Sequence, residues 1–300
     1  MFALRVLLLL FGICACSTAA IFIRAAQLHP LLIAAWRLLL GGALLLPVFL
    51  IARRRHPQPP LRRLLATALP GAVLLALHFW SWNAGLQRAI IANAALIVNM
   101  TAPVMPVVVW LLLRERIGRR ELLGTAVAFC GVLALAGHDL DLDPRYFVGD
   151  AICFGSMLLF VVYLVYARRS RDLPSIWLYV PPVYLIAGGL CLVAGWVVTG
   201  DPLPQHAAAW WPLLGLGVIP TLIGHSILNL SMQRLPSQLV AVLNLLQFLP
   251  AAILAWIVFS EHPHPISFPL AVALVLGGAS IAITDRSRTR GGPAADPQSS

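Results

Sequence analysis

Hydrophobic residues run along this chain in long uninterrupted stretches, separated by short charged or proline- and glycine-rich segments. A helix needs about 20 apolar residues to cross roughly 30 Å of hydrocarbon. Because the stretches are continuous and do not alternate with a period of two, they predict membrane-spanning helices rather than the strands of a barrel. Ten spans are predicted, at residues 4–25, 31–52, 64–86, 93–113, 121–137, 148–167, 175–199, 210–232, 238–259 and 266–284.

The second half of the chain repeats part of the first half. Residues 83–136 align with residues 229–282 at a constant offset of 146 and without a gap. The alignment pairs Asn83 with Asn229, Gln87 with Gln233, Arg88 with Arg234, Ala95 with Ala241, Trp110 with Trp256, Glu115 with Glu261 and Gly131 with Gly277. An unbroken repeat of this length indicates internal duplication. If each half crosses the membrane an odd number of times, the two copies face opposite ways, as in secondary transporters.

The composition requires lipid as the main solvent. The chain of 300 residues is 60% hydrophobic and only 11% charged. All 21 basic residues are arginines, and they gather in alternate loops, leaving only Arg24, Arg88 and Arg145 for the other side. Because short cytoplasmic loops carry the excess of basic residues, we expect both termini to be cytoplasmic. Membrane topology and anionic lipid headgroups then explain the formal net charge of +10, and nucleic acid is not expected as a partner.

The fold class expected from these patterns is an all-α polytopic membrane protein with ten transmembrane helices in two inverted five-helix repeats. We expect the first repeat at residues 1–137, an acidic outer linker at 138–147, the second repeat at 148–284 and a disordered cytoplasmic tail at 285–300. The first stretch resembles a secretory signal, but its apolar run continues through Ile23, so we interpret it as a retained helix. All five cysteines fall inside apolar spans, where core packing is the favoured interpretation.

Several short motifs recur at matching places in the two halves. They are Asn83-Ala-Gly-Leu-Gln-Arg, Ala-Pro-Val-Met-Pro at 102–106, Leu-Leu-Leu-Arg-Glu-Arg at 111–116 and Gly124 through Gly131, then Gly224-His-Ser-Ile-Leu-Asn, Pro250, Ala255-Trp256, Ser260-Glu261 and Gly277-Gly278. With these motifs, and with Ala34-Ala-Trp-Arg37, nearly the whole chain resembles the EamA module of the drug/metabolite transporter superfamily. The resemblance implies two inverted halves, a central pathway lined mainly by helices 1, 3, 4, 6, 8 and 9, and transport of a small polar metabolite across a bacterial-type inner membrane.

One departure from the family concerns the ninth span. Where the family often has Glu-Pro, this chain has Gln247-Phe-Leu-Pro250, so an amide replaces the carboxylate and the proline is displaced. Small multidrug exporters of the wider superfamily use a carboxylate in helix 1, and no Asp or Glu is predicted deep in any span here. A cation-for-proton exchanger of that kind is therefore disfavoured. Prolines are expected to bend spans 4, 8 and 9, at Pro103, Pro106, Pro220 and Pro250.

Polar groups inside spans are costly in hydrocarbon, so we expect them to face the bundle interior or a water-filled cavity. His78 and Trp82 are four residues apart and share one helix face, as do His225 and Asn229. The candidate substrate-binding residues are His78, Trp82, Asn99, Thr101, Ser156, His225, Asn229, Asn244 and Gln247. Amide, hydroxyl and imidazole groups over aromatic walls suit a polar or zwitterionic metabolite.

Each candidate also has a structural interpretation. Asn99 and Asn229 suit interhelical hydrogen bonding as well as substrate contact, whereas the two carboxamides of Asn244 and Gln247 on one face favour a binding site. For His78 and His225, a structural hydrogen-bonding role and a role in binding substrate or transferring a proton are equally favoured.

Structural roles are favoured for four polar side chains, one of them the candidate Ser156. For Ser17 and Ser156, packing or backbone hydrogen bonding is favoured over substrate contact. Arg37 lies about two helical turns from the outer surface. It either neutralises a substrate carboxylate or phosphate, or it snorkels to the surface or pairs with a helix C-terminus, and the second interpretation is favoured. Glu115 is expected to pair with its arginine neighbours, Arg114, Arg116, Arg119 and Arg120.

These patterns favour a secondary transporter that moves a small polar, amino-acid-like metabolite by alternating access, as an exporter or exchanger. A lipid-carrier flippase is an alternative, because basic cytoplasmic loops suit an anionic headgroup. A membrane-embedded enzyme is disfavoured, since no metal-ligand cluster or intramembrane carboxylate is visible. We therefore expect no enzymatic activity, no metal and no cofactor. The expected partners are a small-molecule substrate and membrane lipid, and the oligomeric state is left open.

Overall fold

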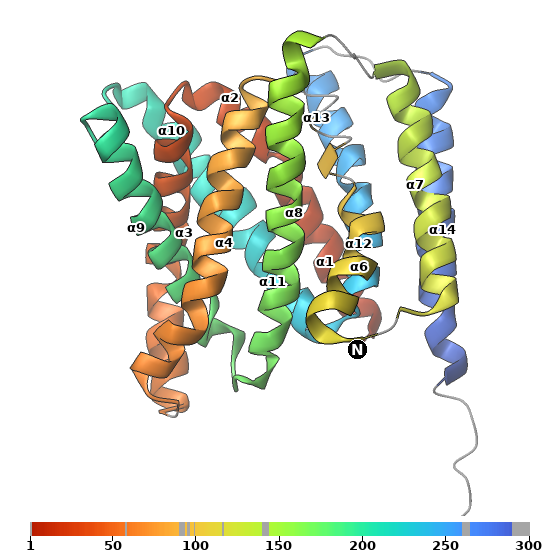
Figure 1. Ribbon diagram of the computed structural model, residues 1–300, viewed down its shortest axis with the longest axis horizontal. Helices are drawn as coiled ribbons and strands as arrows, with labels where there is room; N and C mark the ends of the chain where they lie inside the picture. Colours follow the sequence, from red (N-terminus) through yellow and green to blue (C-terminus); the bar gives the residue numbers. More distant parts are fainter. Residues whose placement is uncertain are drawn as a thin grey trace, which may run out of the picture.

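The structure, a computed structural model, describes residues 2–57, 59–89, 94, 97–98, 100–115, 117–139, 144–259 and 265–289. Every regular element in this part of the chain is a helix (Figure 1). The first half contains α1 (Phe2–Ser17), α2 (Ala19–Ala26), α3 (Pro30–Arg55), α4 (Leu61–Leu86), α6 (Thr101–Leu113) and α7 (Arg119–Asp139). The second half contains α8 (Phe147–Arg169), α9 (Val180–Thr199), α10 (Trp210–Leu216), η5 (Gly217–His225), α11 (Ser226–Arg234), α12 (Ser237–Asn244), η6 (Leu245–Gln247), α13 (Phe248–Phe259) and α14 (Ser267–Thr289). Short 3₁₀ turns lie at η1 (Pro144–Tyr146), η2 (Ser170–Asp172), η3 (Ile176–Leu178) and η4 (Ala207–Ala209).

Many of these helices suit a membrane by length and composition. Among the described residues, seven helical runs are long and apolar enough to cross one: Phe2–Ala26, Pro30–Arg55, Leu61–Leu86, Pro144–Asp172, Ile176–Thr199, Ala207–Arg234 and Ser237–Leu254. Thr101–Leu113 and Ser267–Ala282 are shorter apolar helices. Large hydrophobic side chains such as Leu44, Val193 and Val197 are exposed on the outside of the bundle, where lipid would cover them. The chain is thus a multi-pass membrane protein, and the count of ten crossings stays a prediction.

Three predicted spans are interrupted in the structure. The span at 4–25 breaks at Thr18, the span at 210–232 contains the π-helical segment η5, and the span at 238–259 contains the 3₁₀ turn η6. Pro220 lies inside η5, and a proline without an N–H favours a wider helical turn. Pro250 follows η6 by three residues. Such interruptions leave backbone carbonyls available to other helices.

The helices of the two halves pack against each other in corresponding pairs. α4 packs on α8, and its counterparts in the second half, η5 and α11, pack on α1. α6 packs on α8, and likewise α12, η6 and α13 pack on α1. The remaining pairs join α3 to α9 and α7 to α14, and the latter two helices stand side by side in Figure 1. This arrangement fits a two-repeat architecture in which the halves interleave.

Two glutamines that match in the sequence repeat make equivalent contacts at opposite ends of the bundle. Gln87 donates from Nε2 to the carbonyl oxygen of Leu28 (3.0 Å), between the first two spans of its half. Gln233 donates from Nε2 to Oγ of Ser170 (2.9 Å), between the first two spans of the second half. We call the first end of the bundle the Leu28 end. The other, where α1 begins and α11 ends, is the Glu115 end (Figure 1).

α7 and α14 approach each other through glycines. A Cβ atom on Gly278 would collide with the carbonyl oxygen of Gly124, and one on Gly124 would collide with that of Gly278. The glycines that match in the sequence repeat behave differently. A Cβ on Gly131 would lie 2.8 Å from Leu274 Cβ, whereas Gly277 faces open space. Close backbone packing, rather than side-chain chemistry, holds this pair together.

Candidate functional site

A cavity of about 130 Å³ lies between helices of both halves. Its walls come from α1, α2, α3, α4 and α8, and from the interrupted spans that carry η5 and η6. The described residues that line it are Cys16, Ser17, Ala19, Ala20, Arg37, His78, Phe79, Trp82, Leu86, Val98, Phe160, His225, Leu228, Asn244, Gln247, Phe248 and Ala251. None of these lining residues is acidic, so the formal charge at the cavity comes from Arg37.

Arg37 is held in place by two contacts. Its Nε donates to Oγ1 of Thr221 (3.0 Å), and its guanidinium carbon lies 3.9 Å from the ring centre of Phe79. The side chain is 1% exposed, so the snorkelling interpretation is wrong. Neither Nη1 nor Nη2 has a hydrogen-bond partner among the described residues. An uncompensated buried charge is costly. Arg37 therefore presents two donors without acceptors at the wall of the cavity.

The π-helical segment η5 supplies the partner of Arg37. The wide turn of η5 leaves backbone carbonyl oxygens free to accept hydrogen bonds from other helices. Tyr184 Oη donates to the carbonyl oxygen of Thr221 (3.2 Å). Cys16 Sγ lies 3.9 Å from the carbonyl oxygen of Pro220, a second contact of the same kind. The last residue of η5 is His225, which lines the cavity. One local irregularity thus places both a hydrogen-bond acceptor for Arg37 and an imidazole in the site.

The two histidines lie in an aromatic cluster with Phe79 and Phe160. His78 stacks on Phe160 with ring centres 4.7 Å apart, and His225 meets Phe79 edge-on at 4.8 Å. His78 Nδ1 lies 3.0 Å from the Ser156 carbonyl oxygen and 2.9 Å from its Oγ, and Ser156 Oγ donates to the His78 carbonyl. Because the Ser156 hydroxyl uses its proton in that bond, its oxygen can only accept from the His78 ring. Nδ1 of His78 is therefore the donor. The neutral His78 ring then offers Nε2 as an acceptor.

The end of α12 and the 3₁₀ turn η6 bring two carboxamides to the cavity. Asn244 ends α12 and Gln247 ends η6, and both line the cavity. Ser17 Oγ donates to the carbonyl oxygens of Ile13 (2.9 Å) and Gln247 (3.0 Å), which ties α1 to the turn and agrees with the backbone-bonding interpretation. Oδ1 of Asn244 and Nδ1 of His225 are buried and have no hydrogen-bond partner among the described residues. The cavity therefore combines unpaired donors with unpaired acceptors.

The structure brings five of the nine predicted site residues to the cavity: His78, Trp82, His225, Asn244 and Gln247. Ser156 lies behind His78, as its hydrogen bonds show. Thr101 bonds the carbonyl oxygen of Val98 (2.6 Å) and does not line the cavity. Asn99 lies outside the described residues. Whether any of the nine contacts a substrate stays a prediction.

Below the cavity, on the side of the Glu115 end, the bundle is closed. Asn229 donates from Nδ2 to Tyr163 Oη (2.6 Å) and to the carbonyl oxygen of His225 (2.8 Å). Asn229, Tyr163 and Met232 are fully buried. On the other side, Leu86 borders both the cavity and a depression at the Leu28 end, lined by Ile23, Arg24, Gln27, Gln87 and Ala89. The cavity is therefore more accessible from the Leu28 end than from the Glu115 end.

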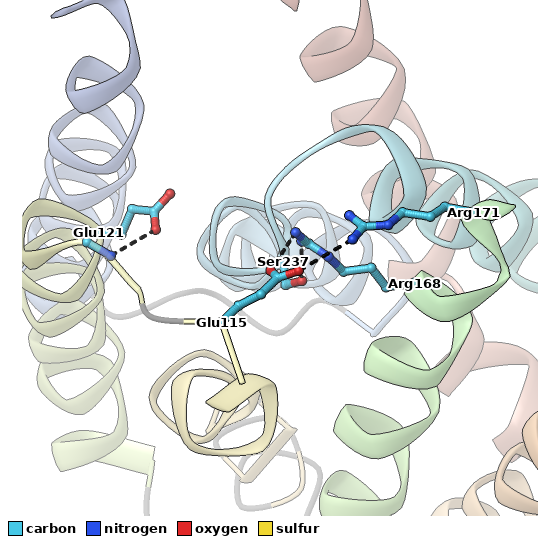
Figure 2. Close-up of polar contacts among 6 residues, drawn as sticks. Glu115, Glu121, Arg168, Arg171 and Ser237 are labelled. Carbon is cyan, nitrogen blue, oxygen red and sulfur yellow. Dashed lines mark hydrogen bonds and ion pairs between the residues drawn. The ribbon is translucent and has the colours of Figure 1, made fainter. Parts of the chain in front are cut away.

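An ion-pair cluster joins three helices at the Glu115 end (Figure 2). Glu115, which follows α6, accepts from Arg168 Nη2 (2.7 Å) and lies 3.6 Å from Arg171 Nη2. Arg168 Nη1 also donates to Ser237 Oγ (2.7 Å) at the start of α12. Glu115 thus pairs with Arg168 at the end of α8 and with Arg171 in η2. The expected pairing with Arg114, Arg116, Arg119 and Arg120 stays a prediction, and Arg116 lies outside the described residues. The cluster bridges the two halves on the closed side.

Sequence reasoning did not include several groups that line the cavity. Phe79, Phe160 and Phe248 were indistinguishable from core residues, because apolar side chains in a span carry no signal of their own. Arg37 did carry a signal, since an arginine well inside an apolar span is costly unless it faces the protein interior. Among the described residues, no group of three His, Cys, Asp or Glu side chains could hold a metal ion. The predictions of no metal and no cofactor stay predictions.

Comparisons with known proteins agree with this architecture. A solved crystal structure superposes with a TM-score of 0.76 at 20% identity, covering 96% of this chain and 99% of that chain, which shows the same fold. An uncharacterized transporter of Archaeoglobus fulgidus is 27% identical over 266 residues, or 88% of each chain. The uncharacterized inner membrane transporter YedA of Escherichia coli is 26% identical over 179 residues, covering 58% of this chain and 55% of that protein. The sequence model of the EamA-like transporter family matches residues 4–137 and 147–284, so this chain is a membrane transporter that belongs to the EamA family.

Proposed function

We propose that this protein is a secondary transporter that moves a small polar, amino-acid-like metabolite across the inner membrane by alternating access, as an exporter or exchanger. Its ten helices form two inverted halves, 1–137 and 148–284, separated by an acidic outer linker at 138–147. A cytoplasmic tail follows at 285–300. The Glu115 end carries most of the arginines and faces the cytoplasm, together with both termini.

The observation that carries the proposal is the cavity between the two halves. Its unpaired donors and acceptors are buried in an otherwise apolar bundle, where such groups are costly and mark substrate pathways. Its volume of about 130 Å³ favours a small metabolite over a lipid-linked substrate. The interruptions η5 and η6 lie at its walls, as irregular backbone does in the binding sites of inverted-repeat transporters.

The arrangement of the two ends supports alternating access. In the conformation described here, the ion-pair cluster of Glu115, Arg168 and Arg171 closes the cytoplasmic end, and the substrate enters or leaves through the Leu28 end. Opening towards the cytoplasm requires the end of α6 to separate from the end of α8, which breaks these ion pairs. The interleaved halves would then rock around the cavity.

Counterflow in proteoliposomes tests the proposal. Vesicles containing the purified protein are loaded with a mixture of unlabelled L-amino acids and related polar metabolites, and labelled members are added outside. We expect labelled substrate to accumulate transiently, and His225→Ala combined with Asn244→Ala to abolish that accumulation. Ser280→Ala, which removes a hydroxyl from the exposed face of α14, is the matched control and should leave it unchanged.

Two results would contradict the proposal. Absence of counterflow for every polar metabolite, together with turnover of a lipid-linked substrate, would identify a flippase instead. Unchanged transport in the His225 and Asn244 double variant would place the substrate elsewhere.

A further inference from the structure

We infer that the two terminal nitrogens of Arg37 form a carboxylate-binding subsite, so that the transported substrate carries a carboxylate group. The inference rests on the proposed transport function and specifies the class of its substrate. It begins from an unusual state of this side chain. Arg37 is 1% exposed, yet Nη1 and Nη2 have no acceptor among the described residues.

The orientation of the guanidinium leaves one edge available for a ligand. An arginine can bind a carboxylate side-on, through Nε and one Nη, or end-on, through both Nη atoms. The Nε–H already donates to Thr221 Oγ1 (3.0 Å), so the side-on edge is occupied. Phe79 covers one face of the guanidinium at 3.9 Å. The end-on edge remains, with two parallel donors that match the two oxygens of a carboxylate.

The charge at the cavity favours a carboxylate over a phosphate. Arg37 carries the formal charge among the described lining residues, and none of them is acidic. A carboxylate brings one negative charge, which neutralises Arg37 in a site of low dielectric constant. A phosphate monoester carries about 1.5 to 2 negative charges at neutral pH and would leave an excess buried charge. The match of one charge to one charge at this contact therefore selects an acidic group with a single negative charge.

The remaining polar atoms complement the rest of an amino-acid-like substrate. Oδ1 of Asn244 is buried without a partner, and the neutral His78 ring offers Nε2 as an acceptor. Both can accept hydrogen bonds from an ammonium or hydroxyl group. The ring faces of Phe79 and Phe160 supply the apolar wall. Donors at Arg37 and acceptors on other helices thus fit a zwitterion that crosses the cavity.

Matched sets of compounds test the subsite. The purified full-length protein is assayed for thermal stabilisation, and its proteoliposomes for counterflow. The compounds are L-amino acids, their carboxamides, the corresponding amines without the carboxyl group, and phosphoethanolamine as a phosphate monoester. We expect only carboxylates to stabilise and exchange. Arg37→Gln should weaken the carboxylate response by about 100-fold or more, because a buried charged contact is lost. Arg37→Lys, which lacks the fork, should weaken it by about 10-fold or more.

Two further variants separate recognition from folding. Thr221→Val keeps the side-chain shape but removes the acceptor of Arg37 Nε. It should raise the carboxylate concentration needed for half-saturation several-fold, without loss of folded protein. Arg145→Gln removes an exposed arginine at η1, outside the cavity, and should change nothing.

The possible outcomes distinguish this inference from the proposed function. Exchange of carboxamides or amines equal to that of the acids would overturn the inference while leaving the transport function intact. A preference for phosphoethanolamine would show that the subsite binds a phosphate and not a carboxylate, and would also overturn the inference. Unchanged selectivity in both Arg37→Lys and Thr221→Val would show that Arg37 does not contact the substrate. Absence of binding and exchange for all compounds would contradict the transport function itself.

Discussion

The α7–α14 pair and the contact of α3 with η5 both join the two halves of the chain, but different physical interactions hold them. Between α7 and α14, Gly124 and Gly278 let the two backbones meet. Between α3 and η5, Arg37 reaches Thr221 and keeps two donors unpaired. The first contact is complete without a ligand, whereas the second leaves a costly buried charge. This difference is why we propose a binding role for the second contact and not for the first.

The comparison also extends to the sequence repeat. Gln87 and Gln233 match in the repeat and make equivalent contacts at helix ends. Asn244 aligns with Val98 in the register of 83–136 with 229–282, and both residues line the cavity, whereas Arg37 lies outside that register. The matched glutamines therefore hold helix ends, whereas the unmatched Asn244 lies where the substrate is proposed to bind.

The largest effect is expected from filling the glycine contact. Gly278→Leu forces α14 away from the Gly124 carbonyl, and overpacking costs about 1–3 kcal/mol even where side chains can move. Here the obstacle is backbone, so we expect loss of most folded protein, measured by size-exclusion chromatography and thermal melting. Gly277→Leu on the same helix faces open space and is the control. Equal yields of the two variants would show that the close approach does not stabilise the fold.

Replacing Arg37 by an apolar side chain should have the opposite effect on stability. Arg37→Met removes a buried charge whose terminal donors are unpaired, and should raise the free energy of unfolding by about 1–4 kcal/mol while abolishing transport. Thermal melting and counterflow measure the two properties on the same preparation. A destabilised variant would mean that Arg37 contributes to the fold, as the glycines do.

Breaking the ion-pair cluster should change conformation more than stability. Glu115 is 37% exposed, so its pair with Arg168 is worth at most about 1 kcal/mol, or a roughly fivefold shift in population. We expect Glu115→Gln to increase maleimide labelling of Met232→Cys from the side of the Glu115 end, measured with Cys14 and Cys130 replaced by serine. Glu121→Gln removes another carboxylate at that end and is the control (Figure 2). Equal labelling in both variants would show that the ion-pair cluster does not control opening at the Glu115 end.

The smallest effect concerns pH at the Leu28 end. His29 precedes α3 and accepts from the N–H of Leu31 at Nδ1 (3.3 Å). Partial burial, and secondarily the charge of Arg88, lower the pKa of His29 below its ordinary value of 6.5. The unfolded chain therefore binds a proton more readily. The stabilisation is present above about pH 6.5 and is lost as the pH falls through the lowered folded pKa.

A melting series across this pH range checks the prediction. His29→Asn keeps an N-cap acceptor but does not titrate, so its melting temperature should fall less towards acid pH than that of the unchanged protein. Parallel curves for the two proteins would exclude a contribution from His29.

Much of the fold could be predicted from apolar runs alone, because each span satisfies its own backbone hydrogen bonds. The places where spans break were harder to predict. Pro220 and Pro250 indicated bends, but not that η5 would be π-helical or that a 3₁₀ turn would form at 245–247. The break at Thr18 carries no proline at all. These details depend on which neighbouring helix accepts or supplies the freed hydrogen bonds.

The candidate site could be predicted only in part. His78, Trp82 and His225 were identified because polar or amphipathic residues inside a span are expensive, and they line the cavity. Thr101 and Asn229 met the same criterion, yet neither lines the cavity, and the Thr101 hydroxyl and Asn229 Nδ2 bond to other groups of the protein. Sequence spacing cannot separate these cases, since a polar residue on an interior face can meet either another helix or a cavity.

The long apolar runs are enough to predict a helical membrane protein, because a chain that is 60% hydrophobic can satisfy the hydrogen bonds of its backbone in lipid by forming helices. The sequence also determined the repeat, since the register of matched residues is visible along the chain. Which buried polar groups lack a hydrogen-bond partner depends on how the helices pack in three dimensions. Thr221 lies 184 residues from Arg37, and its hydroxyl accepts the Nε–H of the guanidinium while both terminal nitrogens are left without an acceptor. Hydrogen-bond satisfaction is a property of neighbours in space, and no local pattern specifies it.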